Sequence, residues 1–171
     1  MQKEKSVAFK CVLLGDTATG KTSFIASLLE NKFLKDYQST IGASFSTYTI
    51  YYESIKITLN FWDASGNPRF SALTPLYFRQ TDACLFFFDV ANIDSFKKIK
   101  FHIDSVISVN STTKLYAVGN KIDLEESRQI SFEEAKNYFD NVGVIFWEIS
   151  CKEKIMIQET ARLIALNLLC I

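Results

Sequence analysis

One glycine-rich segment carries the residue types that hold phosphate groups: Gly15-Asp16-Thr17-Ala18-Thr19-Gly20-Lys21-Thr22. This phosphate loop follows an apolar run and precedes a helix-patterned segment, which is the context the motif needs. The glycines let backbone N–H groups converge on phosphate oxygens, and the helix N-terminus adds partial positive charge. We expect Lys21 to neutralise the terminal phosphates, Thr22 to bind Mg²⁺ and Ser23 to donate to the first phosphate. The alternative is an ordinary glycine turn before a helix.

A second segment, the base loop Asn120-Lys121-Ile122-Asp123, offers an amide and a carboxylate at close spacing. A carboxylate can accept from both the N1–H and the exocyclic amine of guanine, a charge-assisted pair that adenine cannot match. We therefore expect Asp123 to read the base, Asn120 to secure the loop and the Lys121 stem to cover one face of the ring. Alone, the segment also suits a loop that caps a helix. Together with the phosphate loop, it predicts a guanine-nucleotide site.

The elements that must position these loops are visible as alternating apolar and helix-patterned stretches. Strands are predicted over residues 7–14, 45–52, 55–62, 83–90, 115–119 and 144–149, and helices over residues 21–30, 94–108, 131–140 and 153–170. Continuous apolar strands that alternate with helices predict an α/β fold with a mostly parallel sheet covered on both faces. Only Glu53-Ser54 separates the second and third strands, so these two are expected to form an antiparallel hairpin.

Composition narrows the function classes. Nineteen basic and nineteen acidic side chains cancel, so no overall charge favours nucleic acid, and no nucleic-acid partner is expected. No apolar stretch approaches the roughly 18 residues needed to cross a bilayer. Four scattered cysteines show neither metal-ligand nor disulfide spacing, which predicts reduced core or site-lining thiols in a cytosolic protein: Cys11, Cys84, Cys151 and Cys170.

Further motifs lie between and after these two loops, in a recognisable order: Thr40-Ile41-Gly42, Trp62-Asp63-x-x-Gly66 and Ser150-Cys151-Lys152. With them, residues 9–169 resemble the Ras superfamily of small GTPases. The segments 40–45, Arg69-Phe70 and 76–79 make the chain most similar to the Rab family within it. The resemblance implies a P-loop NTPase G domain with a six-stranded, mostly parallel sheet, one antiparallel edge strand and five helices. A single such domain is expected over residues 1–171, without the C-terminal hypervariable or prenylated tail.

The resemblance also implies roles for individual residues. Mg²⁺ is expected to be held by Thr22, Thr40 and Asp63, while Phe33 stacks on guanine and the Gly66 N–H meets the γ-phosphate. The full set expected to contact nucleotide is Asp16, Thr17, Ala18, Thr19, Gly20, Lys21, Thr22, Ser23, Phe33, Tyr37, Thr40, Gly66, Asn120, Lys121, Asp123, Ser150, Cys151 and Lys152.

The implied function is a GTP/GDP-dependent switch in vesicular membrane trafficking, controlled by an exchange factor and an activating protein. Phe45, Trp62 and Tyr77 match the aromatic triad with which Rab proteins engage effector proteins; packing in the core is the alternative for each ring. A monomer is expected, in the cytoplasm and on the cytosolic face of endomembranes. Membrane contact is expected only through a lipidated tail, which this chain does not contain.

The chain departs from the family at its catalytic residues. Asn67 stands where the family has the Gln that orients the attacking water, and Pro68 follows it. Asparagine is one methylene shorter, and a displacement of about 1 Å can cost roughly a hundredfold in rate. Thr17 brings a β-branched side chain close to the transferred phosphoryl group. With Lys21, Thr40, Gly66 and Asn67 as the catalytic set, slow intrinsic GTP hydrolysis is therefore predicted.

Two other functions stay open from the sequence. The first is a GTP-binding scaffold or signalling module with negligible turnover, which the change at Asn67 favours. The second is a phosphate-loop kinase or ATPase, against which Asp123 argues. The single histidine, His102, is expected to pack in a helix far from the motifs, and Cys170 is expected to be buried in the last helix.

Overall fold

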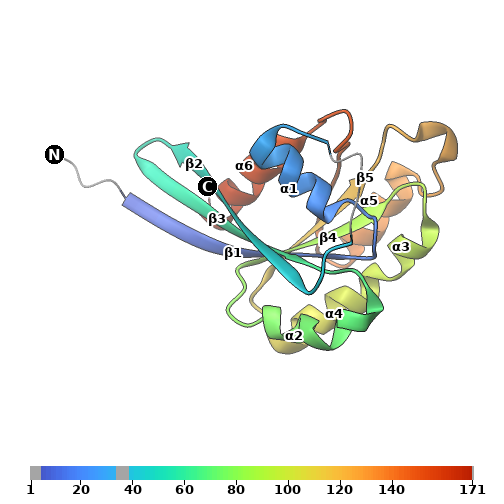
Figure 1. Ribbon diagram of the computed structural model, residues 1–171, viewed down its shortest axis with the longest axis horizontal. Helices are drawn as coiled ribbons and strands as arrows, with labels where there is room; N and C mark the ends of the chain where they lie inside the picture. The colour runs from blue at the N-terminus through green and yellow to red at the C-terminus, as the bar shows by residue number, and fades with distance from the viewer. Residues whose placement is uncertain (1–4, 34–38, 171) are drawn as a thin grey trace.

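The computed structural model describes residues 5–33 and 39–170, which form a sheet with helices on both faces (Figure 1). The six strands of this described part lie in the order β2-β3-β1-β4-β5-β6. Their bounds are β1 Lys5–Gly15, β2 Ala43–Tyr52, β3 Ile55–Ala64, β4 Ala83–Asp89, β5 Lys114–Asn120 and β6 Ile145–Glu148. All neighbours pair in parallel except β2 and β3, which form the predicted antiparallel hairpin with β2 at the edge. The predicted fold class is confirmed.

The helical segments of the described residues are α1 (Lys21–Glu30), α2 (Thr74–Tyr77), α3 (Ile93–Lys97), α4 (Ile99–Val109), α5 (Phe132–Asn141) and α6 (Ile157–Leu168), with the 3₁₀ turns η1 (Pro68–Leu73) and η2 (Glu125–Ser127). Backbone bonds from Lys98 N–H to Asp94 O and from His102 N–H to Lys98 O continue across the α3–α4 boundary, each 3.3 Å long. Counting α3 and α4 as one interrupted helix gives the five predicted helices over the described part of the chain.

The central strands are apolar throughout because both of their faces are covered. Every residue of β4 is buried, whereas burial along the edge strand β2 largely alternates. On one face, α1 and α6 pack against a cluster that includes Phe24, Phe61 and Phe87. On the other, α4 and α5 pack against a cluster centred on Phe88 and Phe139, with rings 6.0 Å apart. Burying each such side chain contributes roughly 1.5–3 kcal/mol to folding.

The first residue of a helix can be predicted from the sequence where a side chain caps the helix. The Ser131 hydroxyl accepts from the Glu134 N–H at 3.1 Å, so α5 begins where its Ser-x-x-Glu sequence predicts. The last helix does not begin at residue 153 as predicted. Ser150 and Ile155 exchange backbone hydrogen bonds in an isolated bridge, and Met156 is left-handed with φ 61°, so α6 starts only at Ile157.

Cys170 is a second correction to the sequence-based prediction. It is exposed beyond the end of α6 instead of buried within that helix, whereas Cys11, Cys84 and Cys151 are buried as expected. None of the helices in the described part of the chain is both long enough and apolar enough to cross a membrane.

Candidate nucleotide-binding site

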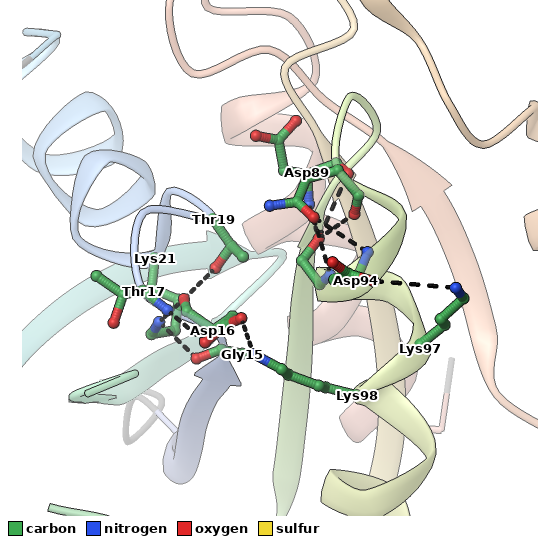
Figure 2. Close-up of polar contacts among 11 residues, drawn as sticks. Gly15, Asp16, Thr17, Thr19, Lys21, Asp89, Asp94, Lys97 and Lys98 are labelled. Atoms are coloured by element: carbon green, nitrogen blue, oxygen red, sulfur yellow. Dashed lines mark hydrogen bonds and ion pairs between the residues drawn. The ribbon is translucent and has the colours of Figure 1, made fainter. Parts of the chain in front are cut away.

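The phosphate loop connects the end of β1 to the start of α1, and its lysine is turned back over the loop (Figure 2). Lys21 Nζ donates to the backbone oxygens of Gly15 and Asp16, both at 2.9 Å. The side chain is buried, and burial lowers the pKa of Lys21 to about 8 although Asp63 and Asp16 act in the opposite direction. A buried ammonium has lost its hydration, so it is suited to meet the negative charge of phosphates.

Gly20 lets the phosphate loop approach the base loop. Its φ is 102°, and a Cβ built at this position would lie 1.9 Å from Asn120 Nδ2. Asn120 itself is buried, with Nδ2 donating to Thr19 O at 2.9 Å and Oδ1 accepting from the Cys151 N–H at 3.2 Å. One amide therefore fastens together the loops that follow β1, β5 and β6.

The three residues expected to hold Mg²⁺ converge. Thr22 Oγ1 donates to Asp63 Oδ2 at 2.6 Å and lies 3.0 Å from Thr40 Oγ1. The other carboxylate oxygen, Asp63 Oδ1, is buried without a hydrogen-bond partner among the described residues. Burial raises the pKa of Asp63, opposed by its hydrogen bond from Thr22 and by the charge of Lys21. Hard oxygen donors and an unsatisfied buried carboxylate oxygen fit a magnesium ion, held directly or through water.

Gly66 lies directly on the phosphate loop. A Cβ at Gly66 would come within 2.4 Å of both the Asp16 carbonyl carbon and the Thr17 nitrogen. The preceding residue is tied to the loop that carries Thr40, because the Ser65 N–H donates to Gly42 O at 2.8 Å. The segments that carry Thr40 and Gly66 are thus hydrogen-bonded to each other, and Gly66 lies against the phosphate loop that would hold the third phosphate.

The base loop opens onto a cavity of about 320 Å³, a size suited to a small ligand. Its lining comes from the phosphate loop and α1, from the segment after α1, and from the loops that follow β5 and β6: Ala18, Gly20, Ser23, Phe33, Asn120, Lys121, Asp123, Leu124, Cys151 and Lys152. Phe33 lines this cavity and is 40% exposed.

Asp123 is held by the loop that follows β6. Ser150 Oγ donates to Asp123 Oδ1 at 2.5 Å and accepts from the Glu153 N–H at 3.0 Å. Lys152 Nζ lies 3.8 Å from Asp123 Oδ2. Lys121 Nζ pairs with Asp89 Oδ2 at the end of β4, at 2.7 Å. Ser150 and Lys152 thereby orient the carboxylate that would read guanine.

Asn67 occupies the position of the expected water-orienting side chain, but its amide is engaged elsewhere. Asn67 Oδ1 accepts from the Arg69 N–H at 3.0 Å and so caps η1, whose first residue is Pro68. The Asn67 N–H donates to Ser65 Oγ at 3.2 Å. The side chain therefore stabilises the turn that follows it.

The aromatic triad is contiguous and partly exposed. The rings of Phe45 and Trp62 are 5.4 Å apart, and those of Trp62 and Tyr77 are 6.1 Å apart. The ammonium of Lys10 lies 5.3 Å from the centre of the Trp62 ring, and Phe45 is 56% exposed. Three elements, β2, β3 and α2, contribute one ring each to this surface.

A second cavity of about 220 Å³ lies between the phosphate loop, the segment from Ser65 to Thr74, and α4. His102 lines it together with Gly66 and Asn67, so the expectation that His102 lies far from the motifs was wrong. Lys98 also lines it and was missed from the sequence. The signal that could have found both is topological, because β1 pairs in parallel with β4 and the helix after β4 must then begin beside the phosphate loop.

Of the expected nucleotide contacts, Tyr37 lies outside the described residues. The others gather in two groups. One lies around Lys21 and Thr22, and the other around the cavity beside Asp123. At one end the site has the Lys21 ammonium and the oxygen atoms that could bind a metal ion. At the other end it has the Asp123 carboxylate and the ring of Phe33.

Comparison with known proteins agrees with this geometry. A family model described as the Ras family matches residues 10–169. Ras-related protein Rab-21 from Mus musculus is 36% identical over 156 residues, which cover 91% of this chain and 70% of the relative. Rab-21 from Homo sapiens is also 36% identical, with 69% of its length covered. GTP-binding protein YPTM1 from Zea mays is 32% identical over 160 residues, 93% of this chain and 77% of the relative. The chain belongs to the Rab family of the Ras superfamily of small GTPases.

Proposed function

We propose that this chain is a GTP/GDP-dependent switch in vesicular membrane trafficking whose intrinsic GTP hydrolysis is slow. The observation that carries the proposal is a site with two chemically different ends. Lys21 and the Thr22–Thr40–Asp63 group suit phosphates with Mg²⁺, while Asp123 suits guanine. Rab-21 and YPTM1 are the named relatives that support a Rab-type switch.

The reaction is in-line attack of water on the γ-phosphate. Lys21 binds the terminal phosphate oxygens and stabilises the charge that develops on them, and the Gly66 N–H donates to the γ-phosphate. Bound Mg²⁺ would be held by Thr22, Thr40 and Asp63 and would neutralise oxygen charge. Since phosphoryl transfer depends mainly on positioning, the placement of the attacking water limits the rate.

Slow hydrolysis follows from the engagement of Asn67. Its carbonyl oxygen caps η1, and turning it toward the water would release the Arg69 N–H. Loss of such a cap costs about 1 kcal/mol. The shorter side chain and this competing hydrogen bond act in the same direction. The same observation favours the second candidate function, a GTP-binding scaffold with negligible turnover.

The partners that we propose for the switch are those that membership of the Rab family implies. Loading with GTP would order the loops around Thr40 and Gly66, next to the contiguous rings of Phe45, Trp62 and Tyr77. Effector proteins would bind there, and an exchange factor and an activating protein would reset the cycle. We place the protein in the cytoplasm and at the cytosolic face of endomembranes, working as a monomer.

Single-turnover hydrolysis of bound GTP by the wild type and Asn67→Gln tests the proposed rate limit. We expect the wild type to turn over slowly and Asn67→Gln to be faster by about tenfold or more, because the longer side chain reaches the water. A wild type that retains GTP without measurable turnover would support the scaffold function instead.

Asn92→Gln is the matched control for this experiment. Asn92 caps α3 through bonds from the Asp94 and Ser95 N–H groups, so lengthening it perturbs a similar cap on another helix. Its hydrolysis rate should equal that of the wild type. If Asn67→Gln is no faster than Asn92→Gln, positioning by Asn67 does not limit the reaction.

A further inference from the structure

A lysine from the other side of the second cavity reaches the phosphate loop. Lys98 lies between α3 and α4, and its Nζ is 2.5 Å from Asp16 Oδ2 (Figure 2). The neighbouring Lys97 points away from the loop toward Asp94, at 3.9 Å. Two consecutive lysines therefore have different partners, and only the second contacts the phosphate loop.

Asp16 connects Lys98 to the lysine that would hold the phosphates. The second carboxylate oxygen of Asp16 accepts from the Thr17 N–H at 3.1 Å. Its backbone oxygen accepts from Lys21 Nζ and from Thr19 Oγ1, both at 2.9 Å. A displacement of Asp16 would therefore move one of the two backbone oxygens that hold the Lys21 ammonium.

The surroundings of Asp16 leave it little room on one side. Gly66 packs so closely on the Asp16–Thr17 peptide that an added Cβ would lie 2.4 Å from it. Beside this contact lies the cavity of about 220 Å³, which Asp16 and Gly66 line together with Lys98 and His102. Lys98 pairs with Asp16 at this cavity, so the ion pair opposes a change in the position of the Asp16 side chain.

We propose that Lys98 is a positioning residue for the nucleotide: through Asp16 it holds Lys21 and the phosphate loop in the geometry that retains the terminal phosphates. Lys98 itself does not touch the nucleotide. The proposal rests on the proposed nucleotide site and adds to it a residue of α3–α4 that no motif contains.

The expected size of the effect is modest, because the Lys98 side chain is 55% exposed. Measured couplings of exposed ion pairs correspond to factors of up to about five. We therefore expect Lys98→Met to speed release of bound GDP about two- to fivefold and to slow single-turnover GTP hydrolysis by a similar factor. Lys98→Arg keeps the charge and should restore most of both rates.

A double-mutant cycle on the full chain tests the route through Asp16. Release of a fluorescent GDP analogue is measured for the wild type, Lys98→Met, Asp16→Asn and the double variant. Asp16→Asn keeps the shape of the side chain and removes its charge. If Lys98 acts through the carboxylate, Lys98→Met should cause no further acceleration in the Asp16→Asn background.

Lys97→Met is the matched control, because it removes the adjacent positive charge and leaves the contact with Asp16 intact. It should release GDP at the wild-type rate. The melting temperatures of Lys97→Met and Lys98→Met without nucleotide should agree, which separates a change in the site from a general loss of stability.

Three results would overturn the proposal: GDP release unchanged in Lys98→Met, acceleration equal in Lys97→Met, or the full Lys98→Met effect persisting in Asp16→Asn. Each presupposes a wild type that retains GDP. A wild type that binds no guanine nucleotide would instead refute the proposed function, and with it this role of Lys98.

Discussion

Asp123 has its first carboxylate oxygen oriented by Ser150 and its second 3.8 Å from the Lys152 ammonium. The side chain is only 10% exposed, yet it lines the cavity of about 320 Å³. A carboxylate fixed in this way loses little entropy when it accepts from a base, so its hydrogen bonds can contribute fully to affinity. We therefore expect preference for guanine over adenine to depend on Asp123.

We expect Asp123→Ala to weaken GTP binding roughly a hundredfold, since losing a charge-assisted pair costs about 3 kcal/mol. Binding of ATP should stay weak, so the preference for GTP over ATP nearly disappears. Competition of GTP and ATP against a fluorescent guanine nucleotide measures both effects.

Glu126→Ala is the control for charge, because Glu126 is an exposed carboxylate in the same region of the chain. It should keep the wild-type preference. Retention of a full GTP preference by Asp123→Ala would place base recognition elsewhere and would revive the ATPase or kinase alternative.

At the scale of elements, the close contact between Gly20 and Asn120 couples the turn after β1 to the turn after β5. Gly20→Ala should displace the Asn120 amide and abolish measurable GDP binding, because the two loops can no longer approach. The left-handed backbone at Gly20 adds strain of roughly 1–2 kcal/mol. Calorimetric titration with GDP and chemical denaturation measure the two consequences separately.

Gly143→Ala provides a control matched in backbone strain. Gly143 is also left-handed, with φ 70°, but a Cβ there would meet no atom within 4 Å. It should lose about 1 kcal/mol of stability and keep wild-type affinity for GDP. Equal affinity losses in both variants would mean that strain, and not the contact with Asn120, controls binding.

Most elements could be predicted because their signals are local. Apolar runs located all six strands, and Ser131 marked the start of α5. The start of α6 was predicted four residues early. The Ser150–Ile155 bridge forms in the segment between β6 and α6, and a helical pattern in the sequence does not reveal such a bridge. Lys98 could not be placed either, since its partner Asp16 lies 82 residues away and only sheet topology brings them together.

In the candidate site, too, some features could be predicted from the sequence and others could not. The phosphate-loop motif for Thr22, and the family resemblance for Thr40 and Asp63, predicted a metal group, and the structure brings the three together. The binding of Mg²⁺ and nucleotide there stays a prediction. The bond from the Arg69 N–H to Asn67 was not foreseen, because a cap and a catalytic position look alike in sequence.

For the whole molecule, the site collects loops that follow β1, β3, β5 and β6, so a bound nucleotide would connect most of the sheet. Mg²⁺ bound with the nucleotide would also give a partner, directly or through water, to the buried Asp63 Oδ1. We expect GDP with Mg²⁺, at about a thousand times its dissociation constant, to add roughly 4 kcal/mol of stability. That should raise the melting temperature by about 10 °C.

Thermal melting with GDP and Mg²⁺, with GDP and a chelator, and with ATP and Mg²⁺ measures this linkage. Chelation should remove part of the gain, and ATP should give little. A melting temperature insensitive to GDP would contradict a site that spans the sheet in this way.

The bond between Asn67 and the Arg69 N–H also bears on timing in the cell. If Asn67 keeps this turn ordered instead of orienting water, intrinsic hydrolysis would be too slow to end the GTP-bound state. The lifetime of that state would then depend on how often an activating protein binds. The abundance of that protein on a given membrane, more than any property of the chain itself, would then determine how long each signal persists.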